Sequence, residues 1–84
     1  MNIELLETEQ NYQNETTTVW FSVDEKNYGV CFEMEPTCGY SFESYATGYH
    51  AKMLDGDGCP EVIGNAALQE IWGALLPMAE AEIS

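Results

Sequence analysis

The chain has 84 residues, of which 15 are Asp or Glu and only 2 are Lys or Arg, so its formal net charge at pH 7 is −13. Hydrophobic residues make up 45% and aromatic residues 12%, which excludes a disordered acidic chain and indicates one folded domain over residues 1–84. Because so few bases are present, direct binding to DNA, RNA or an anionic membrane surface would lack its electrostatic attraction, and we exclude these ligands.

The first part of the chain predicts three strands. We predict a first strand over Ile3–Thr8 and a loop or hairpin connection over the polar segment Glu9–Glu15. Two β-rich runs then lie between Thr16 and Met34, on either side of Asp24–Asn27. These two runs predict an antiparallel hairpin.

Alternation of side chains sets the two faces of this hairpin. A four-residue turn would place both apolar rows on one face, with the pairs Val23–Tyr28, Phe21–Val30 and Val19–Phe32. The other face would carry Thr18, Trp20 and Ser22 beside Gly29, Cys31 and Glu33. It is half polar, as expected for a sheet that is open to water on one side.

The middle of the chain contains two turn signals and one ambiguous segment. Pro and Gly predict a turn at Glu35–Gly39, and Asp55–Pro60 must form a tight loop. Tyr40–Met53 shows helical spacing but also many aromatic residues, and we favour a strand. One face of that strand would carry Tyr45, Thr47, Tyr49, Ala51 and Met53.

A helix is expected over Asn65–Leu76, because the apolar residues Leu68, Ile71, Trp72 and Leu75 recur at helical spacing. Pro60 suits an early helical position, with an acid or Asn65 near the amino end. Pro77 cannot donate to the Gly73 carbonyl, so the helix should end or kink near Leu76 and leave a frayed acidic tail or a short final turn. The expected fold is α+β, a small antiparallel sheet of three or four strands with one C-terminal helix packed on a face.

Two metal-site patterns fail on spacing. Asp55, Asp57, Cys59 and Glu61 resemble the start of a calcium-binding loop, but Pro60 stands where Gly is needed and Ala66 where a bidentate Glu is needed. The zinc-ligand types Cys31, Cys38, His50 and Cys59 are separated by 7, 12 and 9 residues, unlike the close pairs of structural zinc sites. We therefore expect neither a metal nor any other cofactor.

The sequence also argues against an enzyme and for the cytoplasm. The single His50 has no neighbouring nucleophile motif, and the dispersed glycines form no phosphate-binding loop. The first residues lack the features of a signal peptide, and no run reaches the about 18 apolar residues of a membrane span. Three cysteines cannot all pair within one chain, which favours reduced thiols in a cytoplasmic setting.

The excess of acids instead indicates a surface that binds a basic partner, because an ordinary soluble surface mixes charges of both signs. Self-repulsion among so many acids destabilises a fold, which suggests that the negative field itself is useful. Exposed aromatic side chains would supply anchors within such a surface. The candidate contact residues are Glu15, Trp20, Asp24, Glu25, Glu33, Glu35, Glu43, Tyr45, Tyr49, Asp55 and Asp57.

In its small size, its acidity and its mixture of strands and helix, the chain resembles the phage-encoded inhibitors of host defence, such as anti-CRISPR and anti-restriction proteins. Some members of these groups are DNA mimics, and the resemblance covers size and charge without a shared motif. It implies stoichiometric inhibition of a basic nucleic-acid-handling protein, such as a CRISPR or restriction effector. The alternative is a non-inhibitory acidic adaptor or subunit of a phage or host complex, and the chain would be a monomer or a homodimer.

Overall fold

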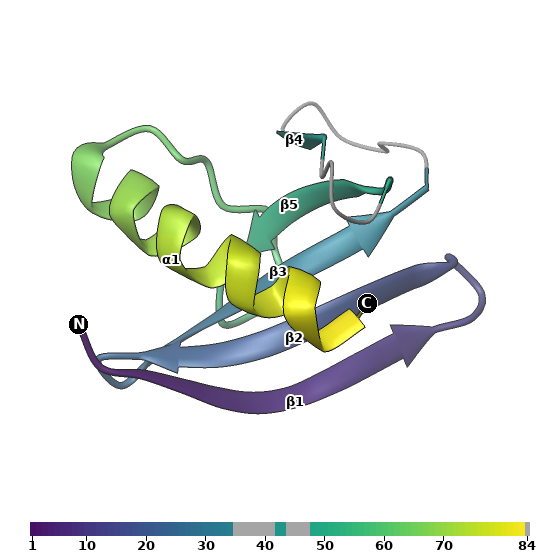
Figure 1. Cartoon of the computed structure of the whole chain (residues 1–84), viewed down its shortest axis with the longest axis horizontal. Helices are drawn as coiled ribbons and strands as arrows, with labels where there is room; N and C mark the ends of the chain where they lie inside the picture. Colours follow the sequence, from purple (N-terminus) through teal and green to yellow (C-terminus); the bar gives the residue numbers. More distant parts are fainter. Residues whose placement is uncertain (35–41, 44–47, 84) are drawn as a thin grey trace.

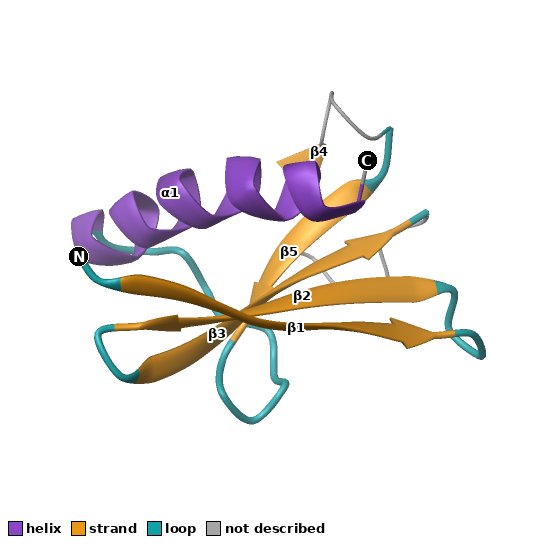
Figure 2. Cartoon of the chain, turned by 60° about the horizontal axis from the view of Figure 1, so that its bottom comes forward, coloured by secondary structure: helices purple, strands orange, loops and turns teal. Residues whose placement is uncertain are grey.

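An antiparallel sheet and one helix form the two layers of the fold (Figures 1 and 2). The structure, a computed structural model, describes residues 1–34, 42–43 and 48–83. The five strands follow the order β1-β2-β3-β5-β4 across the sheet. Strand β4, the last in this order, has only two residues. The elements are β1 (Ile3–Asn11), β2 (Thr16–Val23), β3 (Lys26–Glu33), β4 (Phe42–Glu43), β5 (His50–Leu54) and α1 (Ala66–Ile83). The expected α+β fold with a C-terminal helix on one sheet face is confirmed.

The turn between β2 and β3 has two residues, where four were predicted. Asp24 and Glu25 have φ angles of 50° and 71°, as the type I′ turn of a two-residue hairpin requires. The predicted register was therefore wrong by two residues, and the observed pairs include Val23–Lys26, Phe21–Tyr28 and Val19–Val30. Because side chains alternate with a period of two, this shift leaves both apolar rows on the same face of the sheet.

Strand β1 is longer than predicted. Residues 9–11 continue the strand, and only residues 12–15 form the connection to β2. The Asn11 side chain stabilises this turn, because its Oδ1 accepts hydrogen bonds from the backbone N–H groups of Gln13 at 3.1 Å and Asn14 at 3.2 Å. Local side-chain capping of this kind allows polar residues to end a strand.

The segment predicted as one strand over Tyr40–Met53 contains two strands instead. Phe42 of β4 pairs with Ala51 of β5, and Glu43 pairs with His50, so the chain reverses direction between them. Ala51 and Met53 are buried, 0% and 1% exposed, and belong to the core as the predicted alternation requires. The predicted turn at Glu35–Gly39, together with Tyr40, Tyr45 and Thr47, lies outside the described residues.

The loop predicted at Asp55–Pro60 is present and is held by its first residue. Asp55 Oδ1 accepts hydrogen bonds from the backbone N–H groups of Asp57 at 2.9 Å and Cys59 at 3.0 Å. Pro60 forms an isolated bridge with Leu54 and precedes α1 by several residues, so its predicted place in the helix was wrong. Asn65 caps the helix instead, since its Oδ1 accepts a hydrogen bond from Leu68 N–H at 2.9 Å.

Helix α1 continues through Pro77 to Ile83, so the predicted end near Leu76 was wrong. Both Pro77 and Gly73 lie on the exposed side of the helix, where water can bind the carbonyl that Pro77 leaves without its usual donor. Beyond Pro77, Ala79 is 0% exposed and Ile83 packs against the core. Tertiary packing therefore holds the last turns in helical form despite the proline.

The core lies between α1 and the sheet. Its centre is formed by fully buried side chains from β2, β3, β5 and α1, which include Val19, Phe21, Val30, Met53 and Leu75. Partly buried residues from β1, the loop before α1 and the helix itself surround this centre, namely Ile3, Ile63, Leu68, Ile71, Leu76 and Ile83. All the longer strands and the helix thus share one core.

Candidate functional site

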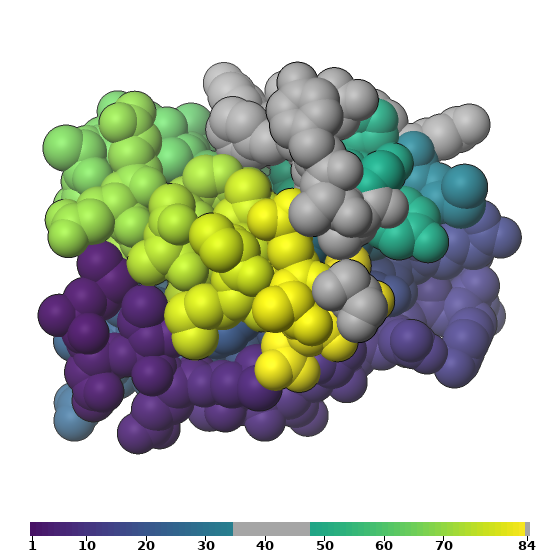
Figure 3. All heavy atoms as spheres, in the orientation of Figure 1, coloured from purple at the N-terminus to yellow at the C-terminus, as the bar shows by residue number. Residues whose placement is uncertain are grey.

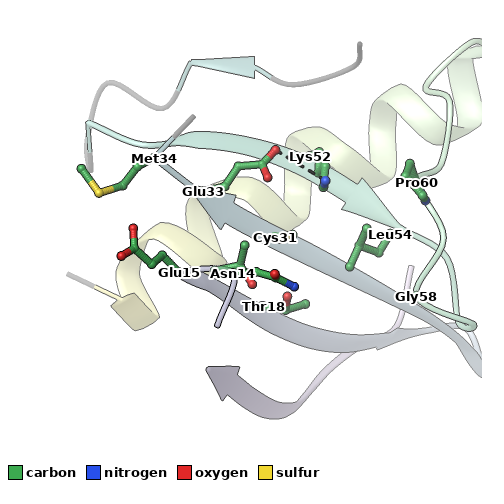
Figure 4. Close-up of a pocket in the computed structure, with 11 residues that line it drawn as sticks. Asn14, Glu15, Thr18, Cys31, Glu33, Met34, Lys52, Leu54, Gly58 and Pro60 are labelled. Atoms are coloured by element: carbon green, nitrogen blue, oxygen red, sulfur yellow. Dashed lines mark ion pairs between the residues drawn. The ribbon is translucent and has the colours of Figure 1, made fainter. Parts of the chain in front are cut away.

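The sheet face opposite α1, here called the outer face, has a buried polar centre. Thr18 of β2, Cys31 and Glu33 of β3 and Lys52 of β5 are between 3% and 9% exposed. Their side chains lie on the strands away from the helix, and Figure 4 shows them together. The prediction that this face is open to water was therefore wrong at its centre.

An ion pair occupies this centre. Lys52 Nζ lies 3.5 Å from Glu33 Oε1, and the two side chains are only 11% and 4% exposed (Figure 4). The strand register explains the contact, because Lys52 lies opposite Cys31 and is thus a diagonal neighbour of Glu33. Glu33 was predicted to contact a partner, which stays a prediction; in the structure it is 3% exposed and forms an ion pair with Lys52.

Cys31 lies within the same polar centre and is suited to packing. Burial raises the pKa of the Cys31 thiol above its ordinary value, while Thr18, and more weakly Lys52, act in the opposite direction. A thiol with a raised pKa stays protonated at neutral pH and is a poor nucleophile. The buried cysteine therefore gives no support to a catalytic role.

The polar centre lines part of an open cavity of about 1030 Å³ (Figure 4). Its lining includes Glu15 from the β1–β2 turn, Cys31 and Lys52 from the sheet, and Pro60 from the loop before α1. Of these, Glu15 is exposed and has a φ of 53°. The outer face is thus concave, and Glu15 contributes a negative charge to its rim.

A row of three glutamates lies beside this centre, on β1. Glu4 pairs with Ser22, Glu7 with Trp20 and Glu9 with Thr18, and directly paired residues share a face. A bulge between Leu5 and Glu7 makes this possible, because a regular strand would place Glu4 and Glu7 on opposite faces. All three side chains are exposed. Glu4, Glu7 and Glu9 are called the glutamate row below.

Trp20 lies next to the glutamate row and is fixed there. Its indole Nε1 donates a hydrogen bond to Glu9 Oε2 at 3.1 Å. The ring covers Gly29 of the neighbouring strand, where an added Cβ would come within 2.9 Å of Trp20 Cζ3. Trp20 is half-buried. It therefore presents part of a rigid aromatic surface among carboxylates.

The other predicted contact residues are distributed around the sheet. Asp24 and Glu25 are exposed at the β2–β3 turn, where Asp24 Oδ1 accepts a hydrogen bond from Asn2 N–H at 2.8 Å. Asp57 is exposed in the loop after β5, Asp55 organises that loop, and Tyr49 is 41% exposed. Of the remaining three, Glu43 lies in β4, and Glu35 and Tyr45 lie outside the described residues.

Those predicted residues that lie within the described part of the chain therefore do not form one cluster. The structure brings Trp20 together with the glutamate row, which sequence reasoning did not single out as a site. The signal that was available is the density of Glu in Ile3–Asn11, but the spacing of Glu4, Glu7 and Glu9 fits neither a regular strand nor a helix face. Only the bulge makes the three residues neighbours on one face.

Neither a candidate metal site nor a helix able to span a membrane is found among the residues that the structure describes. Within residues 1–34, 42–43 and 48–83, no group of three or more His, Cys, Asp or Glu side chains is placed to hold a metal ion. The same described residues include no helix that is both long and apolar enough to cross a membrane.

Comparison of the chain with known proteins finds no matching family model, no matching curated protein and no matching solved structure.

Proposed function

We propose that the protein is a stoichiometric inhibitor that binds a basic nucleic-acid-handling protein through its acidic outer face. In this role its carboxylates stand where nucleic-acid phosphates would stand, and the protein acts by binding and not by catalysis. A CRISPR or restriction effector would be a partner of the required chemistry, with a phage as the source of the inhibitor and the cytoplasm as its location.

The observation that carries the proposal is the alignment of the glutamate row on one exposed face of a folded strand. A bulge in β1 brings Glu4, Glu7 and Glu9 to the same side as Trp20. Regular strand geometry separates alternate residues by about 6.7 Å, so Glu7 and Glu9 form a short linear array of charge. An array held on a sheet needs little ordering when a partner binds, which favours affinity.

The distribution of positive charge supports the same reading. Of the chain's two lysines, Lys52 is buried against Glu33. Lys26 lies with its Nζ 5.5 Å from the ring centroid of Tyr28, a core residue on the helix side of the sheet. Lys52 is therefore engaged by Glu33, and Lys26 lies on the helix side of the sheet, opposite the face that carries the glutamate row.

The size of the charge also fits nucleic-acid mimicry. The molecule measures 31 × 25 × 25 Å, and a duplex of the longest dimension carries roughly 18 phosphate charges. The net charge of −13 is of the same order. Such a field accelerates association with a basic groove and makes the complex sensitive to salt.

The proposal is tested by capturing the heparin-binding fraction of a bacterial lysate on the immobilised protein. We expect specific proteins to be retained at about 50 mM salt, to be released steeply by about 200 mM salt, and to be displaced by duplex DNA. Retention of no nucleic-acid-binding protein at low salt would contradict the proposal. Retention that persists while DNA stays bound to the same partner would instead favour the acidic adaptor.

A matched pair of variants separates the surface from the total charge. E7Q/E9Q and E70Q/E82Q change the net charge equally, and all four glutamates are exposed. We expect E7Q/E9Q to weaken capture at least tenfold and E70Q/E82Q to weaken it less than threefold. Equal losses for the two variants would show that net charge alone, and not the outer face, drives binding.

A further inference from the structure

Strand β1 forms an open edge of the sheet. In the described part of the chain it pairs with β2 on one side only, and it is the first strand in the sheet order. Of its nine residues, Ile3 is half-buried and the other eight are exposed. Figure 3 shows the atoms of these first residues, in purple, along the rim of the molecule beside the helix.

An open edge is a template for one more strand. Along an antiparallel edge, alternate residues direct backbone N–H and C=O groups away from the existing partner, where an extended segment can bind them. The bulge between Leu5 and Glu7 interrupts this pattern, but residues 7–11 pair regularly with β2. Five residues at the end of β1 therefore present a regular ladder of backbone groups.

The side chains of this segment alternate in chemistry. Glu7 and Glu9 lie on the outer face, whereas Thr8 and Gln10 pair with Val19 and Thr17 and so lie on the helix side. A strand added to β1 would place alternate side chains beside the two glutamates. Like charges in that position repel, and opposite charges attract, so the added strand should carry Lys or Arg at those positions.

The helix side of the same segment borders a groove of mixed polarity. The groove, of about 510 Å³, lies where α1 ends; its lining includes the polar residues Thr8, Gln10 and Glu82 and the apolar residues Phe32 and Ile83. Phe32 belongs to the core and Ile83 packs against it. A strand added to β1 could direct a small apolar side chain toward this groove.

We propose that β1 binds an extended basic segment of the partner protein by strand addition. Lys or Arg at alternate positions pair with Glu7 and Glu9, and the residues between them are apolar and face the groove. This inference rests on the proposed function and specifies the kind of segment that a basic partner must supply. Main-chain hydrogen bonds contribute affinity, and the alternation of side chains contributes specificity.

A second copy of the chain is a poorer occupant of the same edge. Pairing of two β1 strands would bring two glutamate rows onto one continuous sheet face, and each copy carries a net charge of −13. Such like-charge contacts are unfavourable on a sheet. Charge complementarity therefore selects a basic partner strand over self-association.

The experiment uses an acetylated and amidated Lys-Val-Lys-Val-Lys-Val-Lys peptide as the probe and the ¹⁵N-labelled full chain as the target. NMR titration at low salt should show the largest shift changes in the amides of residues 7–11. A peptide of the same sequence, methylated on every backbone nitrogen, retains its charge but cannot donate main-chain hydrogen bonds. We expect it to bind at least tenfold more weakly. E7Q should also weaken binding of the unmodified peptide, and E70Q, at an exposed helix position that does not line the groove, should have a smaller effect.

Strand addition is overturned if the methylated peptide binds as tightly as the unmodified one, or if the shift changes lie away from β1. It is also overturned if sedimentation shows that the chain is a dimer and hydrogen exchange shows that the β1 amides are protected in that dimer. None of these results removes capture of basic proteins through charge, so the proposed function stands or fails separately in the lysate experiment.

Discussion

The two faces of the sheet bury their centres by different means. On the helix side, Phe21, Val30 and Leu75 are fully buried in an apolar contact between layers. On the outer face, the centre consists of Glu33 and Lys52 with polar or weakly polar neighbours. The first face gains stability from transfer of apolar surface out of water, whereas the second must offset the desolvation of charges.

This difference separates stability from specificity in one small sheet. The apolar face holds α1 and tolerates even a proline within the helix. On the outer face, one of the chain's two lysines forms a buried ion pair with Glu33, and the glutamates of β1 are exposed beside this pair. We infer that the fold is stabilised mainly on the helix side, and that the outer face adds the glutamate row to the exposed acids of the turns and of α1.

The largest expected effect comes from breaking the ion pair on one side only. Lys52→Met leaves the buried Glu33 carboxylate without its countercharge, and we expect the free energy of unfolding to fall by about 3–5 kcal/mol. The loss is a large part of the stability of a chain this short, so it should be visible as a lower urea midpoint measured by circular dichroism.

The matched variant Glu33→Leu/Lys52→Met removes both charges and supplies apolar volume. We expect it to recover most of the lost stability, because replacing a whole buried pair is often neutral. If the double variant is as unstable as Lys52→Met, the charge of Glu33 is not the cause of the loss. The comparison between the two faces would then need a different explanation.

Much of the helix-covered face could be predicted from the sequence. Alternation in Thr16–Met34 placed Val19, Phe21 and Val23 together correctly, although the register was wrong by two residues. The predicted face was still correct, because a shift of two residues leaves each side chain on the same side of the sheet. The error itself arose because Asp24 and Glu25 both adopt positive φ in a two-residue turn. An Asp-Glu pair predicts such a turn less strongly than Asn-Gly does.

The outer face could be predicted less well, for two physical reasons. Its burial depends on contacts between segments far apart in the chain, as in the pairing of Glu33 on β3 with Lys52 on β5. Its charge pattern depends on the bulge near Leu5, and no residue type marks that position. Alternation around Lys52 placed this lysine on the face opposite the core, where it was expected to meet water, so the local sequence did not indicate its burial.

A smaller effect, of opposite sign, is expected on the helix side. Pro77→Ala restores a backbone donor for the Gly73 carbonyl at an exposed position of α1, and we expect unfolding free energy to rise by about 1–3 kcal/mol. Urea denaturation and amide exchange of residues 78–83 measure the gain. Gly73→Ala, which has nothing within 4 Å of the added Cβ, is the control and should gain no more than about 1 kcal/mol. A loss of stability in Pro77→Ala would show that the proline ring itself packs favourably.

The smallest effect concerns the contact that fixes Trp20 beside the glutamate row. Gly29→Ala places a Cβ within 2.9 Å of Trp20 Cζ3 and 3.0 Å of Thr18 Cγ2, so the indole must shift. We expect a loss of about 1 kcal/mol, typical of mild overpacking. In a Trp72→Phe background, which leaves Trp20 as the only tryptophan, its emission should move to longer wavelength as the ring becomes more exposed.

The Trp20→Ala background is the control for that loss, because the ring that Gly29→Ala displaces is then absent. There Gly29→Ala should cost markedly less, and the difference between the two backgrounds measures the coupling of the two residues. If the cost is the same in both, the Thr18 contact and not the indole limits the space above Gly29. Trp20 would then not be held by its contact with Gly29, and its position beside the glutamate row would rest on the hydrogen bond to Glu9.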